Sequence, residues 1–459
     1  MDNNTICSIS TAPGHGAISI IRISGKKSIR IINKLFKAHD KNKLSSKNTK
    51  KVILGNIIYK NQSIDEVLVT AFQSPKSYTG EDMVEISCHG SAYIQSKIIQ
   101  ALIDNGCRTA QKGEFTMRAF LNGKLDLSQA EGVANLIASE NEQSHKIAMK
   151  QMRGGFSDEI KNLRKKFIKF AALIELELDF SQEDVEFANR EELLNLIDNI
   201  EDKISKLANS FKLGNVIKNG IPITIVGSPN SGKSTLLNQI LNEERAIVSN
   251  IKGTTRDTIE ENIVINGYKF KFIDTAGLRN TQDKIEKIGI SKTYKKISES
   301  AFILYMIDKT EFNEVETEEE ILSIQKKMQY NDSLIVLANK HDLHEQDIFL
   351  KTIKNVNIIN ISAKNGDKIG VILETIMSKV QAWGDVNNQI IIINQRHFES
   401  LINTLKSISD IKKGLKQNIS GELLSIDIKN CLEYLGQITG EITNDNLLDS
   451  IFQDFCIGK

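Results

Sequence analysis

A phosphate-binding loop is the part of this sequence most able to do chemistry. Residues 227–234 read Gly-Ser-Pro-Asn-Ser-Gly-Lys-Ser and match the pattern G-x-x-x-x-G-K-[ST] at every fixed position. Its glycines let successive backbone N–H groups point at phosphate oxygens, while Lys233 can reach the β- and γ-phosphates and the Ser234 hydroxyl can bind Mg²⁺. A glycine-rich turn before a helix is the alternative, but a β-branched strand at 223–226 and a helix at 234–241 favour a P-loop.

Three motifs further along the chain indicate that the bound base is guanine. They are Asp274-Thr275-Ala276-Gly277 after a strand at 270–273, Asn339-Lys340-His341-Asp342 after a strand at 333–338, and Ser362-Ala363-Lys364 after a strand at 357–361. The Asp342 carboxylate can accept hydrogen bonds from guanine N1–H and N2–H₂, a pair of donors that adenine lacks. Each motif is weak alone, but together with the P-loop they predict a guanine-nucleotide domain built on an α/β sheet.

The segment between the P-loop and Asp274 is placed where a switch loop is expected. Within Gly253-Thr254-Thr255-Arg256-Asp257, the Thr255 hydroxyl can bind Mg²⁺ in the triphosphate state and leave after hydrolysis, with a surface turn as the alternative. The predicted nucleotide-contacting residues are Asn230, Ser231, Gly232, Lys233, Ser234, Thr235, Ser249, Asn250, Ile251, Lys252, Gly253, Thr254, Thr255, Asp274, Thr275, Ala276, Gly277, Asn339, Lys340, Asp342, Ser362, Ala363 and Lys364.

The glutamine that orients the attacking water in Ras-type enzymes is absent. Its position, directly after D-x-x-G, is Leu278, which can neither donate nor accept a hydrogen bond. Asn230, inside the P-loop, is a neutral oxygen ligand suited to a monovalent cation that could replace an arginine finger. Glu286 is an acidic candidate for orienting the water, although a solvated charge on a helix face remains the alternative.

Segments on both sides of this domain carry further motifs. They are Thr5-Ile6-Cys7 to Ile21-Arg22-Ile23-Ser24-Gly25, Ser77-Tyr78-Thr79-Gly80-Glu81-Asp82-Met83-Val84-Glu85, the run 112–131 beginning Lys112-Gly113-Glu114-Phe115-Thr116, and the terminal Phe455-Cys456-Ile457-Gly458-Lys459. Together they resemble the MnmE (TrmE) family of tRNA-modification GTPases over essentially the whole chain. Ribosome-assembly GTPases share the central motifs but lack those at the two ends of the chain, so they are the weaker alternative. A nucleotide-switched scaffold is a further alternative.

The resemblance implies roles for particular residues. Members of the family hydrolyse GTP with K⁺-dependent dimerisation of their G domains. The residues implied are Asn230, Ser249, Ile251 and Thr254 for K⁺, Ser234 and Thr255 for Mg²⁺, Glu286 for orienting water, Arg22, Glu85, Lys124 and Lys459 for 5-formyl- or 5,10-methylene-tetrahydrofolate, and Cys456 as a catalytic thiol.

The resemblance also implies a reaction and partners. With an FAD-containing partner of the MnmG (GidA) type, the family adds an aminomethyl or carboxymethylaminomethyl group to C5 of the wobble uridine of certain tRNAs. A reduced folate supplies the one-carbon unit. A homodimer that forms a heterotetramer with the partner is implied.

Composition places few further limits on function. The chain of 459 residues is 40% hydrophobic and 25% charged, with a net charge of +1, so it lacks the overall basic character of a nucleic-acid-binding protein. A local patch at 161–166 could contact tRNA, but such a run is more often one solvated face of a helix. The partner is therefore expected to supply most of the tRNA contact.

Cysteine usage and the lack of apolar segments predict a cytoplasmic protein without a membrane span. The five cysteines show no C-x-x-C pair or metal-ligand spacing, and Cys7, Cys88, Cys107 and Cys431 lie in apolar runs typical of a core. Cys456 is expected to be mobile unless something docks the tail. Residues 1–25 lack the pattern of a targeting segment, and no apolar run is long enough to cross a bilayer.

The pattern of elements predicts three domains. Residues 1–120 alternate β-branched runs with two helical patches, 27–36 and 92–104, which is typical of an α+β domain similar to folate-binding domains. Helical periodicity begins near 125, so residues 121–215 and 382–459 are predicted to form one discontinuous all-α domain. The P-loop G domain, 216–381, is then inserted between them. This arrangement would return the tail to the N-terminal domain, in its own chain or in a second one.

The guanine assignment can be tested at Asp342. We expect Asp342→Asn to weaken GDP binding by about 3 kcal/mol and to improve binding of xanthosine diphosphate, because an amide can donate to the xanthine oxygen. Equilibrium titration with the two diphosphates measures both effects. Guanine affinity equal to that of the unchanged chain would remove the base assignment.

Overall fold

Two compact units, each assembled from separate stretches of sequence, make up the chain. In a computed structural model, residues 4–40, 44–45, 49–179, 190–242, 247–248, 260–274, 295–328, 333–344, 356–384, 389–417, 419, 421–443, 445–453 and 455–458 are described. The first unit comprises Met1–Ile137, Met149–Ile197 and Lys406–Lys459, and the second comprises Ala138–Ala148 and Asp198–Leu405.

A mixed sheet forms the N-terminal part of the first unit. Its strands, in spatial order, are β3 (Phe36–Ala38), β4 (Val52–Tyr59), β5 (Gln62–Phe72), β6 (Met83–Gly90), β2 (Gly16–Ser24), β1 (Ile6–Ile9) and β7 (Arg108–Thr109). Neighbouring strands are antiparallel except β1 and β7. Because side chains alternate along a strand, Ile21 and Ile23 enter the core while Arg22 lies on the other face.

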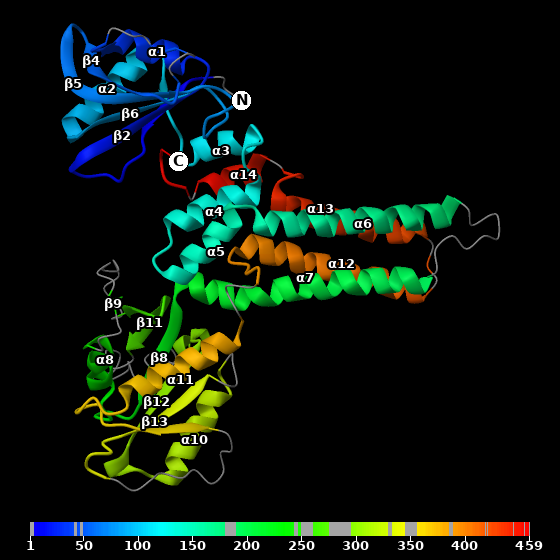
Figure 1. The fold of residues 1–459 in the computed structure, drawn as a ribbon. Helices are drawn as coiled ribbons and strands as arrows, with labels where there is room; N and C mark the ends of the chain where they lie inside the picture. The colour runs from blue at the N-terminus through cyan, green and yellow to red at the C-terminus, as the bar shows by residue number, and fades with distance from the viewer. Residues whose placement is uncertain are drawn as a thin grey trace, which may run out of the picture. The chain divides into compact units, whose positions relative to one another are not determined.

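Helices α1 (Ser28–Leu35) and α2 (Ala92–Asp104) cover the core face of this sheet (Figure 1). The predicted α+β domain, with its two helical patches, is therefore confirmed. Helix α3 (Glu114–Leu121) was not predicted, because it precedes the point near residue 125 where helical periodicity was expected to begin.

The rest of the first unit is helical. Its further helices are α4 (Leu127–Ile137), α6 (Gly155–Asp179), α13 (Gly421–Thr439) and α14 (Asp445–Phe452), while α5 (Glu142–Met152), α7 (Arg190–Asn219) and α12 (Gln395–Lys416) cross between the units in sequence. Helices α6 and α13 lie side by side (Figure 1), although more than 200 residues separate them in the chain. This pairing confirms an all-α region built from two chain segments.

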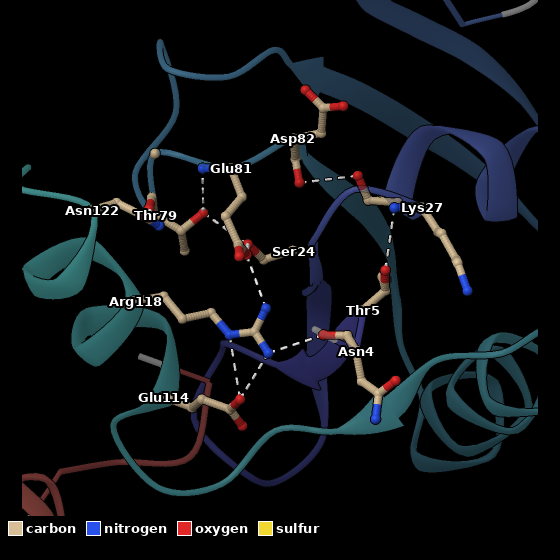
Figure 2. Close-up of polar contacts among 12 residues, drawn as sticks. Asn4, Thr5, Ser24, Lys27, Thr79, Glu81, Asp82, Glu114, Arg118 and Asn122 are labelled. Carbon is tan, nitrogen blue, oxygen red and sulfur yellow. Dashed lines mark hydrogen bonds and ion pairs between the residues drawn. The ribbon is translucent and has the colours of Figure 1, made fainter. Parts of the chain in front are cut away.

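A buried ion-pair network joins α3 to the sheet and to the turn before β6 (Figure 2). The Glu114 carboxylate is 3% exposed and accepts hydrogen bonds from Arg108 at 2.6 and 2.8 Å and from Arg118 at 2.9 Å. Arg118 also donates to Glu81 and to the backbone oxygen of Asn4, both at 2.9 Å. One guanidinium therefore ties together the chain start, the turn and the helix.

A doubly wound sheet forms most of the second unit. Its strands, in spatial order, are β14 (Asn357–Asn360), β13 (Leu334–Asn339), β12 (Phe302–Asp308), β8 (Ile221–Gly227), β11 (Tyr268–Asp274), β10 (Glu260–Ile265) and β9 (Ile247–Val248). The five from β14 to β11 are parallel, and β10 and β9 continue the sheet antiparallel. Strands β12 and β13 are buried throughout, as expected for parallel strands covered on both faces.

Helices lie on both faces of this sheet (Figure 1). Apolar side chains of α8 (Lys233–Asn242) and α11 (Ile369–Ala382) pack with Leu304 and Met306 of β12. Those of α10 (Glu314–Gln325) pack on the opposite face with Ile303, Tyr305 and Ile307. Alternate side chains of β12 therefore contribute to two hydrophobic cores, one on each face of the sheet. The predicted P-loop α/β domain is confirmed.

The residues flanking this α/β domain in sequence meet inside the second unit. The rings of Phe211 in α7 and Phe398 in α12 stack with centroids 4.5 Å apart.

Four of the cysteines, 7, 88, 107 and 431, are buried as predicted, and Cys456 is exposed. Among the described residues, no helix combines the length and apolar character needed to cross a membrane.

The network around Glu114 should be a large source of stability for the first unit. We expect Glu114→Gln to lower the free energy of unfolding by about 3 kcal/mol, because the buried Arg118 and the partly exposed Arg108 lose their shared carboxylate. Urea unfolding followed by hydrogen exchange of the α3 and β1 amides measures this loss. The exposed pair Lys206–Asp202 provides the control, and Asp202→Asn should cost no more than about 0.5 kcal/mol.

The effect of Glu114→Gln should also depend on pH. Burial, the largest influence, raises the pKa of Glu114, but hydrogen bonds from Arg108, the Gln111 N–H and Arg118 outweigh it and hold the pKa below its ordinary value of 4.5. The stabilisation is therefore complete above that ordinary value and is lost as pH falls through the lowered one. A difference between variant and unchanged chain that persisted undiminished in strong acid would contradict this role.

Candidate functional site

Five parallel strands of the second unit end at one edge of the sheet, and the predicted nucleotide motifs follow four of them. The P-loop follows β8, which lies between β11 and β12, where the direction of strand addition reverses. Ligands of open α/β sheets bind at this switch point, beyond the carboxyl ends of the strands. Asp274 ends β11, Asn339 ends β13, and Ser362 follows β14.

Gly232 is one of the positions at which the backbone of the P-loop requires glycine. Gly232 has φ +99°, and a Cβ built there would lie 2.4 Å from Nδ2 of Asn339. Asn230 has φ +61°, in the left-handed region that asparagine tolerates better than most residues, and it is exposed. These conformations form the tight loop that phosphate binding needs.

The functional groups of the loop lie on its outer side. Lys233 Nζ donates to the carbonyl oxygens of Gly227 at 3.0 Å and Ser228 at 2.7 Å, which holds the ammonium against the loop. Ser234 and Thr235 are exposed at the start of α8, so the Ser234 hydroxyl is accessible to a metal ion. An exposed hydroxyl beside a glycine-dependent loop fits the oxygen ligation that Mg²⁺ prefers.

Asn339 connects three loops at this edge. Its Nδ2 donates to Ser231 O at 2.7 Å and its Oδ1 accepts from Ala363 N–H at 2.9 Å, while the residue is only 4% exposed. The amide therefore fixes the P-loop and the loop after β14 relative to β13. Asn339 is among the predicted nucleotide contacts, and the structure adds this bridging role.

Lys340 and Asp308 form an ion pair that was not predicted from the sequence. Asp308 ends β12 and is 4% exposed. Burial, the largest influence, raises the pKa of Asp308, but hydrogen bonds from Lys340 and Thr310 outweigh it and hold the pKa below its ordinary range. The signal that could have identified Asp308 is its position, because it is a carboxylate at the carboxyl end of a strand, as Asp274 is.

The residues expected around the base are brought to the same edge. Asp342 is exposed in the turn after β13, Ser362 and Ala363 are buried, and Lys364 is exposed. The Ser362 hydroxyl accepts from Asn365 N–H at 3.3 Å, which shapes this loop from within. An exposed carboxylate beside a rigid loop is suited to recognising the edge of guanine.

Several predicted site residues lie outside the described residues. They are the switch-loop residues Ser249, Asn250, Ile251, Lys252, Gly253, Thr254 and Thr255, then Thr275, Ala276, Gly277 and Glu286, and finally Lys459. Their roles in binding K⁺, Mg²⁺, water and folate stay predictions.

In the first unit, the sheet brings Arg22 and Glu85 together. The two residues are directly opposite in the β2–β6 register, and Arg22 Nε donates to Glu85 Oε1 at 2.8 Å, with side chains 22% and 29% exposed. The guanidinium also lies 5.7 Å from the ring centroid of Tyr78. Burial raises the pKa of Tyr78, and its hydroxyl is hydrogen-bonded to Thr116. Lys124 is exposed in the turn after α3.

The C-terminal tail docks on the N-terminal region of its own chain. Lys112 and Ile457 form an antiparallel bridge, and the Ser10 hydroxyl donates to Gly458 O at 3.0 Å. Gly458 has φ +93°, and a Cβ there would lie 2.3 Å from Ile9 O. Cys456 is therefore exposed on a segment that is held against the N-terminal region of the same chain.

The close contact at Gly232 generates a test of the P-loop. We expect Gly232→Ala to reduce GDP affinity at least about a hundredfold, because the added methyl group would collide with Asn339 at a strained φ. Fluorescence titration with a labelled GDP measures the loss. Gly370→Ala is the matched control, since a Cβ there meets nothing within 4 Å, and equal affinities in the two variants would contradict the geometry.

Comparison with known proteins covers the whole chain. The family model "GTP-binding protein TrmE N-terminus" matches residues 5–124 and the model "MnmE helical domain" matches residues 127–456. Proteins named tRNA modification GTPase MnmE are 51% identical in Flavobacterium johnsoniae, 49% in Christiangramia forsetii and 47% in Bacteroides thetaiotaomicron. Each alignment covers 100% of this chain and at least 99% of the relative. By full-length identity and by both family models, the chain belongs to the MnmE family of tRNA modification GTPases.

Proposed function

We propose that this protein hydrolyses GTP and uses the reaction to drive modification of tRNA. The modification is the addition of an aminomethyl or carboxymethylaminomethyl group to C5 of the wobble uridine, with an FAD-containing MnmG-type partner. The observation that carries the GTPase part is the meeting of the P-loop, the guanine motif and the loop after β14 at one sheet edge, joined by Asn339. Family membership supports the tRNA part.

The described residues have distinct tasks in GTP binding. The P-loop backbone binds phosphate oxygens at the start of α8, and Lys233 turns from the loop carbonyls toward the phosphates. Ser234 would hold Mg²⁺, together with Thr255 from outside the described residues, and the ion would offset the negative charge of the phosphates. Asp342 would accept hydrogen bonds from guanine, and Ala363 would bound the base pocket.

Hydrolysis needs groups that replace the missing glutamine and arginine finger. Asn230 is exposed on the P-loop, where its side-chain oxygen is available to K⁺. We infer that Ser249, Ile251 and Thr254 complete the K⁺ site and that Glu286 orients the attacking water. K⁺-dependent pairing of the G domains within a homodimer belongs to this proposal.

A reduced folate is proposed to bind the first unit. Arg22 and Glu85 offer donors and acceptors on the sheet face away from α1 and α2, and Lys124 adds an exposed cation. Lys459 and the Cys456 thiol belong to the tail, whose docking on residues 9–10 and 112–113 supports a place near the N-terminal region. 5-Formyl- or 5,10-methylene-tetrahydrofolate would supply the one-carbon unit.

The remaining proposals concern organisation. We propose three domains, residues 1–120, residues 121–215 with 382–459, and residues 216–381, in a homodimer that forms a heterotetramer with the flavoprotein in the cytoplasm. A ribosome-assembly GTPase, the alternative reading, leaves the matches at residues 5–124 and 127–456 without explanation.

One reconstitution tests the proposal. The full-length chain, the flavoprotein, GTP, Mg²⁺, 5,10-methylene-tetrahydrofolate, glycine as the amine donor and unmodified tRNA are combined in KCl or in NaCl of equal ionic strength. Phosphate release should be at least about tenfold faster in KCl, because a cation replaces the arginine finger. Mass spectrometry of digested tRNA should detect the modified uridine only when folate is present, while phosphate release continues without folate.

The outcomes separate the parts of the proposal. Lys233→Ala should abolish both readouts. Equal rates in the two salts would contradict the K⁺ site and direct attention to an activating arginine from another protein. Rapid hydrolysis without any modified uridine in the complete mixture would contradict the tRNA assignment.

A further inference from the structure

Lys309 is a buried cation at the sheet edge that carries the guanine motif. It follows Asp308 at the end of β12, begins a single 3-10 turn (Lys309–Glu311) and is 3% exposed. Its Nζ lies 2.8 Å from Nδ1 of His341 and donates to Oδ1 of Asn360 at 3.2 Å. Because burying an ammonium is costly without hydrogen bonds, these acceptors stabilise it there.

The contact gives one ring nitrogen of His341 a defined role. An ammonium has three donors and no acceptor, so Nδ1 accepts the hydrogen bond from Lys309. The backbone N–H of His341 also donates to Ile361 O at 3.1 Å. The residue is thus held through its ring by the end of β12 and through its backbone by the residue after β14.

Two consecutive residues at the end of β12 therefore hold two consecutive residues of the guanine motif. Asp308 pairs with Lys340, and Lys309 bonds to His341. Lys340 has φ +64°, a left-handed conformation that costs a non-glycine residue about 1–2 kcal/mol. A turn that contains such a residue depends on contacts of this kind to keep its shape. Asp342 is the next residue, and its carboxylate is exposed.

We propose that Lys309 is a positioning residue for base recognition, which fixes the His341 ring and thereby orients the turn that presents Asp342 to guanine. The inference rests on the proposed GTP-binding function. It adds that guanine specificity in this chain depends on a buried lysine that lies outside the N-K-x-D motif. Lys309 acts through His341 rather than by touching the base.

Lys309→Met tests the inference, because it removes the charge and keeps most of the side-chain volume. We expect the GDP affinity of the full-length protein to fall about tenfold, measured by titration calorimetry. The ratio of affinities for GDP and inosine diphosphate, which lacks the 2-amino group, should fall at least about threefold. The kcat at saturating GTP should change less than about twofold, because the chemical step is untouched.

Two variants of His341 and one control accompany this measurement. His341→Leu removes the acceptor and should reproduce both losses. His341→Asn keeps an oxygen near the place of Nδ1 and should stay within about threefold of the unchanged chain, a rescue that lost packing alone would not give. Lys326→Met alters an exposed lysine at the end of α10 and should change neither affinity nor ratio.

Unchanged GDP affinity in Lys309→Met would overturn the inference, as would an equal loss for GDP and inosine diphosphate. If Lys309→Met loses its thermal unfolding transition, His341→Leu decides the question by the same two criteria. An unchanged chain that binds adenosine and guanosine diphosphates equally would contradict the proposed function instead, so the two failures are distinguishable.

Discussion

The nucleotide site depends on one constraint, that parallel strands deliver their carboxyl ends to the same edge of a sheet. The P-loop, Asp308, Asn339 and the loop after β14 come from different parts of the sequence, yet each lies at the carboxyl end of a parallel strand. Short polar contacts then join these loops, through the Asn339 amide and through the Lys340–Asp308 pair. The strands therefore form a rigid frame, and the polar contacts between the loops at their ends position the functional groups.

The first unit uses a different device, a buried ion-pair network. The run 112–131 resembles the family most specifically, yet its charged residues Glu114 and Arg118 point into the protein. Glu114 binds Arg118, which also binds Glu81 (Figure 2). Glu114 binds Arg108 as well. Removing one partner from such a network leaves a buried charge without compensation, so these residue types are hard to exchange. The same region supplies Lys112 and Gly113, against which the tail packs. Much of a diagnostic motif can thus be structural.

Prediction from sequence succeeded where a pattern has a direct local cause. The β-branched run before the P-loop forms a strand, and the P-loop itself forms a tight loop before a helix, as predicted. Both features depend on residues that are close together in the sequence. Helix α3 was missed because Glu114, Phe115, Thr116 and Arg118 are all buried, so its polar residues do not mark a solvent face. Asp308 and Lys309 were missed because their partners are set by strand order, which periodicity does not reveal.

By itself the sequence determined the kind of chemistry: a phosphate-binding loop, a carboxylate for guanine, and the family to which these motifs belong. These follow from residue types at short fixed spacings, whose backbone requirements are local. The tertiary structure alone decided which distant groups meet. Register placed Arg22 against Glu85, strand order placed Lys309 against His341, and the returning chain placed residues 456–458 against residues 9–10 and 112–113. Such contacts depend on packing between segments far apart in sequence, and no local pattern encodes them.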